Sequence, residues 1–216
     1  MDLVIFDLDG TLIDSSRDLA NAVNATRAHL GLAPIENETV YSYVGNGAPV
    51  LIRKALGPEY ADEEVQSALE YFLAYYREHM LDNTVLYPGV REVLDEFRRA
   101  GLTMAVLTNK PVRFSQGIVD GLGLGAHFRR VYGGNSFEQK KPHPVGIETL
   151  MNEAGAAREE TVMVGDSSVD VQTARNARVT ACGVTWGFQP DTFAAWPPDF
   201  LVNTAGELAD RVLGRG

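Results

Sequence analysis

Short runs of consecutive apolar residues recur along the chain, and longer segments with helical periodicity lie between them. The apolar runs are at residues 3–6, 103–107, 161–164 and 180–184, and the helical patterns at 90–97, 145–154 and 168–177. Apolar, β-branched runs of this length are typical of strands buried on both faces of a sheet. Strands that alternate with helices indicate parallel βαβ units. We therefore expect an α/β fold, a Rossmann-like parallel sheet with helices on both faces.

The alternation stops between about Ser15 and Asn83, where only helical periodicity is visible. Leu19, Val23 and Leu30 mark one helical face, and Ser15 and Asp18 have the spacing of a capping box. A length of 216 residues suits one domain with a sizeable insertion. We predict a core catalytic domain of residues 1–14 and 84–216, and an all-helical cap domain of residues 15–83 that covers the strand ends as a lid. The aromatic residues of this segment, Tyr76 among them, are expected to pack in the cap core.

The composition, with 45% hydrophobic and 22% charged residues, is that of an ordinary globular protein. The 19 basic and 29 acidic residues give a net charge of -10, which opposes binding to nucleic acid or an anionic membrane. An anionic substrate would therefore need a local positive site. The single cysteine, Cys182, permits no intrachain disulfide, and the N-terminus has no signal-peptide pattern. We expect a cytoplasmic enzyme, monomeric or homodimeric, without nucleic-acid or membrane partners.

Polar residues with possible chemical roles follow several of the predicted strands. Asp7 and Asp9 come directly after the first strand, with Gly10 allowing a sharp turn, and Thr108 and Asn109 follow the second. Further along the chain, a strand-like run at 130–132 and a loop precede Lys141, which stands before Pro142 and Pro144, two prolines that make the backbone rigid. The pair Asp166 and Asp170 follows the strand at 161–164. In a parallel sheet these turns share one edge, so we expect one cleft to contain Asp7, Asp9, Thr108, Lys141, Asp166 and Asp170. Four carboxylates in one cleft would bind a hard cation, and Mg²⁺ prefers such oxygen ligands.

These motifs, in this order, resemble those of the haloacid dehalogenase-like hydrolase superfamily over essentially the whole chain. The order is Asp-x-Asp-Gly-Thr, Thr-Asn, Lys-Pro and Gly-Asp-x-x-x-Asp. Within this superfamily, the chain is most similar to the phosphoglycolate phosphatase branch. The features that support this are the helical insertion, the segment 43–48 in it, Gly133-Gly134 and the segment 141–144. The resemblance implies a Mg²⁺-dependent phosphatase that acts on a small anionic phosphate ester. We expect 2-phosphoglycolate to be the substrate.

The resemblance also implies a role for each motif residue. Asp7 would attack phosphorus and form an aspartyl phosphate, and Asp9 would protonate the leaving oxygen and then activate water. The metal would be held by Asp7, the Asp9 backbone carbonyl and Asp166, with Asp170 binding it directly or through water. Phosphoryl oxygens would be bound by Thr108 and Lys141. Further substrate contacts are expected from Asn109 and from the cap loop Gly45, Asn46 and Gly47, whose backbone N–H groups could meet a substrate carboxylate.

Two other functions fit parts of the pattern. A phosphosugar mutase of the β-phosphoglucomutase type has the same motifs and a similar cap, and a related phosphatase could act on other small sugar or nucleotide monophosphates. A phosphorylated receiver domain also combines aspartates, a threonine and a lysine around Mg²⁺. In a receiver domain, however, the phosphorylated aspartate follows a later strand and no helical segment is inserted after the first.

Overall fold

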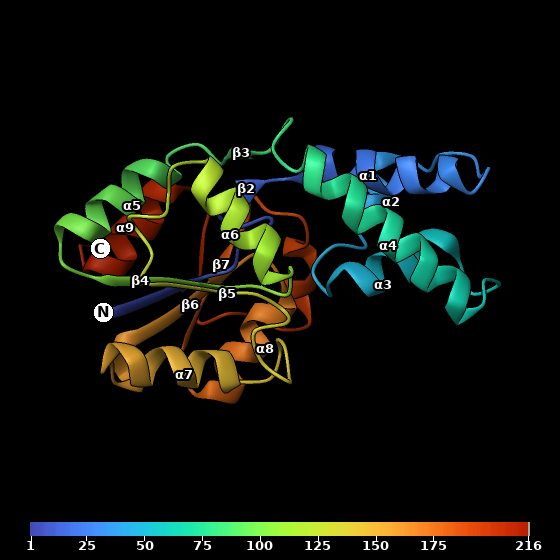
Figure 1. Cartoon of the computed structure of the whole chain (residues 1–216). Coiled ribbons are helices and arrows are strands. Elements are labelled where there is room, and N and C mark those ends of the chain that lie inside the picture. The colour runs from blue at the N-terminus through green and yellow to red at the C-terminus, as the bar shows by residue number, and fades with distance from the viewer. Residues whose placement is uncertain (216) are drawn as a thin grey trace.

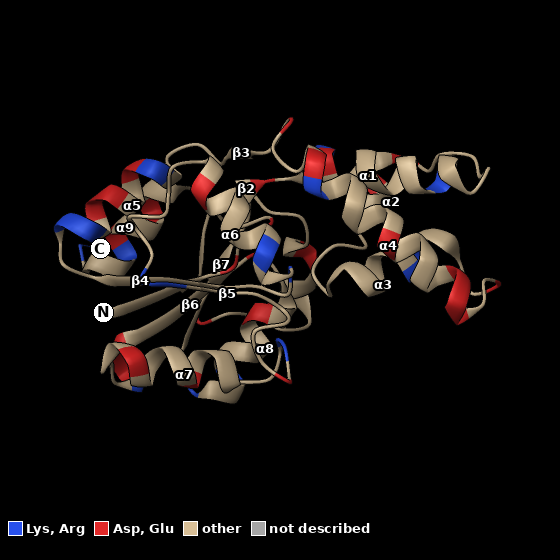
Figure 2. Cartoon of the chain, viewed as in Figure 1, with Lys and Arg blue, Asp and Glu red and all other residues tan. Residues whose placement is uncertain are grey.

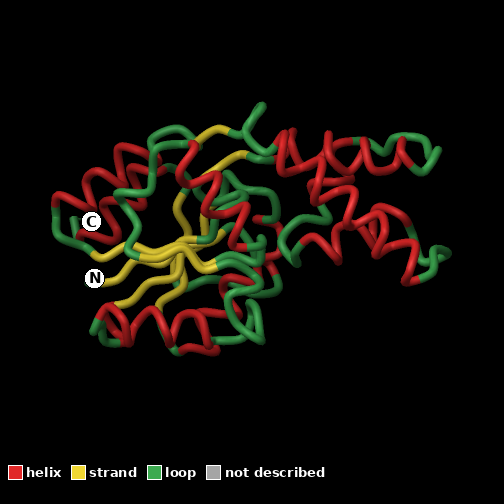
Figure 3. Tube along the Cα trace, viewed as in Figure 1, coloured by secondary structure: helices red, strands yellow, loops and turns green. Residues whose placement is uncertain are grey.

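A six-stranded parallel sheet forms the centre of the computed structural model, which describes residues 1–215 (Figures 1 and 3). The strand order is β5-β4-β1-β6-β7-β8. The strands are β1 (Leu3–Phe6), β4 (Thr103–Leu107), β5 (Arg130–Tyr132), β6 (Thr161–Gly165), β7 (Thr180–Val184) and β8 (Phe200–Val202). The predicted α/β fold and its four apolar strands are confirmed, whereas β8 is a short edge strand that the apolar pattern did not indicate.

Helices cover both faces of this sheet, because β1 is apolar at every position and presents alternate residues to opposite faces. Val4 and Phe6 pack in the cluster under α5 (Val90–Arg99), α6 (Val112–Gly121) and α9 (Ala205–Leu213). Leu3 and Ile5 pack in the cluster under α7 (Val145–Ala154) and α8 (Ser168–Ala177). Short 3-10 helices lie at Arg158–Glu160 and Pro190–Ala194. The central strand is therefore shielded from water on both sides.

The strand register aligns the turns that carry the polar motifs. Phe6, the last residue of β1, is paired with Val106 of β4 and with Val164 of β6. Strands β4 and β6 end one residue later, at Leu107 and Gly165, so the turns after all three strands lie at the same edge of the sheet. This edge faces the inserted helices (Figure 1).

The inserted segment forms four helices with a hydrophobic cluster of their own. They are α1 (Ser16–His29), α2 (Asn37–Tyr41), α3 (Ala48–Leu56) and α4 (Asp62–His79). The segment is bounded by a small antiparallel pair, β2 (Ile13–Asp14) and β3 (Val85–Leu86), where the chain leaves the core and returns to it. The division into a cap of residues 15–83 and a core of 1–14 and 84–216 stays a prediction.

The predicted capping box at the start of α1 is wrong. Ser15 occupies the N-cap position, but its side chain makes no capping hydrogen bond, and its hydroxyl donates instead to Asp9 Oδ1 at 2.5 Å. The buried Asp18 carboxylate accepts hydrogen bonds from Asn83 and Thr84, 65 and 66 residues later in the chain. Both side chains form hydrogen bonds with residues outside α1, which the local spacing of the sequence does not indicate.

Figure 2 shows acidic and basic residues in separate short segments of the outer helices, with no continuous basic stretch in this view. None of the helices within residues 1–215 has the length and apolar character needed to cross a bilayer.

Candidate active site

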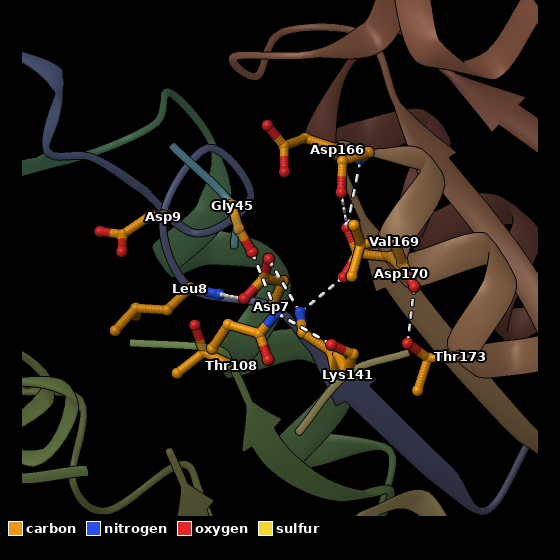
Figure 4. Close-up of polar contacts among 12 residues, drawn as sticks. Asp7, Leu8, Asp9, Gly45, Thr108, Lys141, Asp166, Val169, Asp170 and Thr173 are labelled. Carbon is orange, nitrogen blue, oxygen red and sulfur yellow. Dashed lines mark hydrogen bonds and ion pairs between the residues drawn. The ribbon is translucent and has the colours of Figure 1, made fainter. Parts of the chain in front are cut away.

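Asp7, Asp166 and Asp170 converge at the carboxyl edge of the sheet (Figure 4). One carboxylate oxygen from each lies within 4.8 Å of the others, and all three residues are buried. Asp9 does not belong to this group, since its side chain points away from Asp166 in Figure 4. The expected cluster of four carboxylates is thus a cluster of three.

The Asp7 carboxylate is held by two donors. The Leu8 N–H donates to Oδ1 at 2.7 Å, and Lys141 Nζ lies 3.0 Å from Oδ2. Burial raises the pKa of Asp7 to about 6, against the opposing effect of the Lys141 charge. The carboxylate is therefore oriented by the fold, and more positive charge beside it would lower its pKa.

Lys141 joins two of the clustered carboxylates. Besides Asp7, its ammonium contacts Asp170 Oδ1 at 2.6 Å. The other Asp170 oxygen accepts from the Ser167 N–H at 3.2 Å and from the Ser167 hydroxyl at 2.8 Å, as the third residue of a capping box on α8. Burial lowers the pKa of Lys141, but the charges of Asp170 and Asp7 outweigh this and raise it, so the side chain is cationic.

Asp166 lies against the loop that follows β7. The Phe188 N–H donates to its Oδ2 at 2.7 Å. A side chain on Gly187 would lie 2.2 Å from Asp166 Cβ, and one on Gly10, whose φ is +82°, would meet Asp166 Oδ2. Burial, with the charges of Asp170 and Asp7, raises the pKa of Asp166 well above its usual range. The two glycines allow the backbone to come this close to the carboxylate.

The carboxylate group fits a divalent cation. Three buried carboxylates share one ammonium, that of Lys141, so the cluster as a whole is negative when ionised. The raised pKa values of Asp7 and Asp166 have the same cause, a lack of positive charge in a desolvated site. Carboxylate oxygens are ligands that suit Mg²⁺.

Asp9 has a separate set of partners, including a lysine that the sequence patterns did not single out. Lys110 Nζ lies 3.0 Å from both Asp9 oxygens and donates to Tyr76 Oη at 2.8 Å. Tyr76 is buried in the cap cluster as expected, but its hydroxyl also reaches the core. The sequence signal that could have identified Lys110 is its position directly after Thr108-Asn109, at the same strand end.

Thr108 and Asn109 are buried at the end of β4, beside the cap loop. The Thr108 hydroxyl accepts from the Lys110 N–H at 3.3 Å. The Asn109 amide donates to the carbonyls of Gly45 and Lys141 at 3.0 and 3.2 Å, and its own Oδ1 is buried without a partner within the described residues. Asn109 therefore links the cap loop to the loop that carries Lys141.

A cavity lies between these core residues and the cap. Its empty volume, including space open to solvent, is about 540 Å³. The structure brings Asp7, Asp9, Thr108 and Asn109 to its lining, and Gly45 and Gly47 from the cap loop. Lys141 and Asn46 do not line it, and the Asn46 carbonyl accepts from Lys140 Nζ at 2.7 Å. The cap contributes apolar side chains, among them Leu19, Val44, Leu51, Phe72 and Leu73.

Known proteins are similar to this chain in sequence. A family model described as haloacid dehalogenase-like hydrolase matches residues 4–184. The phosphoglycolate phosphatase of Colwellia psychrerythraea is 38% identical over 214 residues, with 96% of this chain and 95% of that protein covered. The phosphoglycolate phosphatase of Pseudomonas putida is 45% identical over 192 residues, which cover 86% of this chain and 70% of that protein.

Solved structures show the same arrangement. The crystal structure of a predicted phosphoglycolate phosphatase from Haemophilus somnus superimposes with a TM-score of 0.91 at 31% identity, covering 100% of this chain and 98% of that one. A predicted phosphatase from Clostridium acetobutylicum has a TM-score of 0.87 at 23% identity and covers 99% and 98% of the two chains, a likeness of fold alone.

Proposed function

The chain belongs to the haloacid dehalogenase-like hydrolase family, and from this premise we propose that it is a phosphatase that hydrolyses 2-phosphoglycolate. The observation that carries the proposal is the Asp7 carboxylate, which lines the cavity and is held by Lys141 beside two further carboxylates. Such a carboxylate can act as a nucleophile toward phosphorus.

We propose that Asp7 and Asp166 hold Mg²⁺ through their side chains, with the Asp9 backbone carbonyl as a further ligand. Both Asp170 oxygens already accept hydrogen bonds from Lys141 and Ser167, so Asp170 is assigned to orienting Lys141 and to metal contact through water. When bound, the ion would neutralise charge on the carboxylates and on the phosphoryl group.

The chain's own residues would carry the reaction steps. An oxygen of Asp7 attacks phosphorus as the bond to the leaving oxygen breaks, and the Asp9 carboxyl gives that oxygen its proton. Thr108 and Lys141 bind the phosphoryl oxygens. Water then attacks the aspartyl phosphate, with Asp9 as the base, and inorganic phosphate leaves. The cap helices exclude bulk water from the cavity during these steps.

The test is release of inorganic phosphate from 2-phosphoglycolate and from a panel of sugar and nucleotide monophosphates, with Mg²⁺ and with a chelator. We expect Mg²⁺-dependent turnover with 2-phosphoglycolate as the best substrate. Asp7→Asn, which keeps the shape of the side chain, is expected to abolish turnover while the melting temperature shows a folded protein.

Three outcomes would contradict the proposal. Asp7→Asn with wild-type turnover would exclude the aspartyl phosphate. A faster reaction with another monophosphate would show that 2-phosphoglycolate is not the preferred substrate. Isomerisation of β-glucose 1-phosphate without phosphate release would identify a mutase.

A further inference from the structure

Lys110 carries a buried positive charge whose purpose the phosphatase mechanism leaves open. Its ammonium has three partners, the two Asp9 oxygens and the Tyr76 hydroxyl, and it lies 4.5 Å from the centroid of the Tyr76 ring. Burial lowers the pKa of Lys110, but Asp9 and Tyr76 outweigh it and raise the pKa, so the side chain is cationic. A desolvated ammonium needs an anionic partner at every stage of the reaction.

The position of Lys110 places this charge where a substrate would lie. Within the described chain, Lys110 is the only lysine or arginine among the residues that line the cavity. Asp7 and Thr108 form the end of the cavity where the phosphoryl group is proposed to bind, and the cap side chains around the rest are mostly apolar. A second anionic group on the substrate therefore has one cation available to it in this space.

The present partner of Lys110 is also the proposed acid–base residue. While both oxygens of Asp9 lie 3.0 Å from the ammonium, the carboxyl is held toward Lys110 and away from Asp166 (Figure 4). To protonate the leaving oxygen, Asp9 must come within hydrogen-bond reach of it. A substrate anion that takes the place of Asp9 on Lys110 would leave the ammonium paired and the Asp9 side chain free.

We propose that Lys110 is the residue that selects substrates with a carboxylate next to the phosphate ester, by exchanging Asp9 for the substrate carboxylate when the substrate binds. The inference rests on the proposed function, since it concerns the same cavity. A phosphate ester without a carboxylate cannot make this exchange, so its binding leaves Asp9 tied to Lys110. The selected class is that of short phosphorylated hydroxy acids.

The experiment compares 2-phosphoglycolate with ethyl phosphate, which has the same number of carbons and no carboxylate. With enzyme in excess, kcat/KM is measured on both for the wild type and for Lys110→Met. We expect Lys110→Met to lower kcat/KM for 2-phosphoglycolate by about 100-fold or more, and for ethyl phosphate by less than about tenfold. Lys110→Met also frees Asp9 when ethyl phosphate is bound, so this effect of the variant, like the loss of the carboxylate contact, lowers the preference for 2-phosphoglycolate.

Two further variants serve as controls. Lys110→Arg keeps the charge and should keep the preference for 2-phosphoglycolate. Lys140→Met removes the neighbouring lysine, which contacts the Asn46 carbonyl outside the cavity, and should leave the ratio unchanged. Should Lys110→Met be unstable, the loss of preference must appear in Lys110→Gln.

The outcomes separate this inference from the proposed function. An equal loss on both substrates, or an unchanged preference in Lys110→Met, would overturn the role of Lys110 and leave the phosphatase assignment intact. A wild-type enzyme that hydrolyses ethyl phosphate and not 2-phosphoglycolate would overturn the proposed substrate as well.

Discussion

Two neighbouring aspartates of one turn have different surroundings. Asp7 lies with Asp166 and Asp170, where burial raises its pKa, whereas Asp9 is paired with Lys110 and Ser15. Successive side chains of an extended backbone point in alternate directions, but the turn at Gly10 breaks this rule. Two carboxylates two positions apart can therefore have different partners and different proposed roles.

At this scale we expect Asp9→Asn to lower kcat by roughly 10²- to 10⁴-fold, because the amide cannot deliver or accept the proton. The same change leaves the Lys110 ammonium buried without its counter-ion, so the free energy of unfolding should fall by about 3 kcal/mol. Steady-state kinetics and urea unfolding measure the two effects. The double variant Asp9→Asn, Lys110→Met should regain stability without regaining activity, and a wild-type kcat in Asp9→Asn would contradict the assigned role.

The helical segment and the core are joined at the two places where the chain crosses between them. The start of α1 and the return of the chain at residues 83–84 are connected by the Asp18 carboxylate, which accepts from the N–H groups of Asn83 and Thr84 at 2.9 and 2.8 Å and from both of their side chains. The pairing of β2 with β3 lies next to this connection.

We expect Asp18→Ala to lower the free energy of unfolding by about 3 kcal/mol, because buried donors lose a charged acceptor. Asp62→Ala is the matched control, since Asp62 is an exposed residue whose ion pair with Arg53 should contribute about 1 kcal/mol or less. Chemical denaturation of the two variants gives the comparison. Equal losses of stability in Asp18→Ala and Asp62→Ala would show that Asp18 does not stabilise the connection between the helical segment and the core.

The molecule as a whole buries excess negative charge at one edge of its sheet. The pKa of Asp7 is raised to about 6 and that of Asp166 is raised well above its usual range, both chiefly by burial. A carboxyl whose pKa is higher in the folded state than in the unfolded chain stabilises the fold at low pH. That contribution is lost as pH rises from the unfolded pKa, 3.8 for Asp7, through the folded value of about 6.

Mg²⁺ should therefore raise the melting temperature more at about pH 7.5 than at about pH 5, because protons compete with the ion for the same carboxylates at low pH. A thermal-shift titration at both pH values measures this. Asp166→Asn should reduce the shift, while Asp62→Ala should keep it. An equal shift at both pH values would place the bound ion away from the carboxylate cluster.

Local sequence patterns were sufficient to predict the parallel sheet, the helical insertion and the motif residues of the strand ends. Buried strands read as continuous apolar runs, and the register of a parallel sheet brings their ends to one edge. The pattern did not indicate β8, an edge strand only three residues long.

The tertiary structure decided which polar side chains meet. Ser15 and Asp18 have capping-box spacing, yet their partners are Asp9, Asn83 and Thr84. The contact of Lys110 with Tyr76 joins residues 34 apart in the chain and on separate elements. The periodicity of apolar residues indicates on which face of its own helix or strand a residue lies. Hydrogen bonds and ion pairs between elements depend on how those elements are placed relative to one another, which no local spacing records.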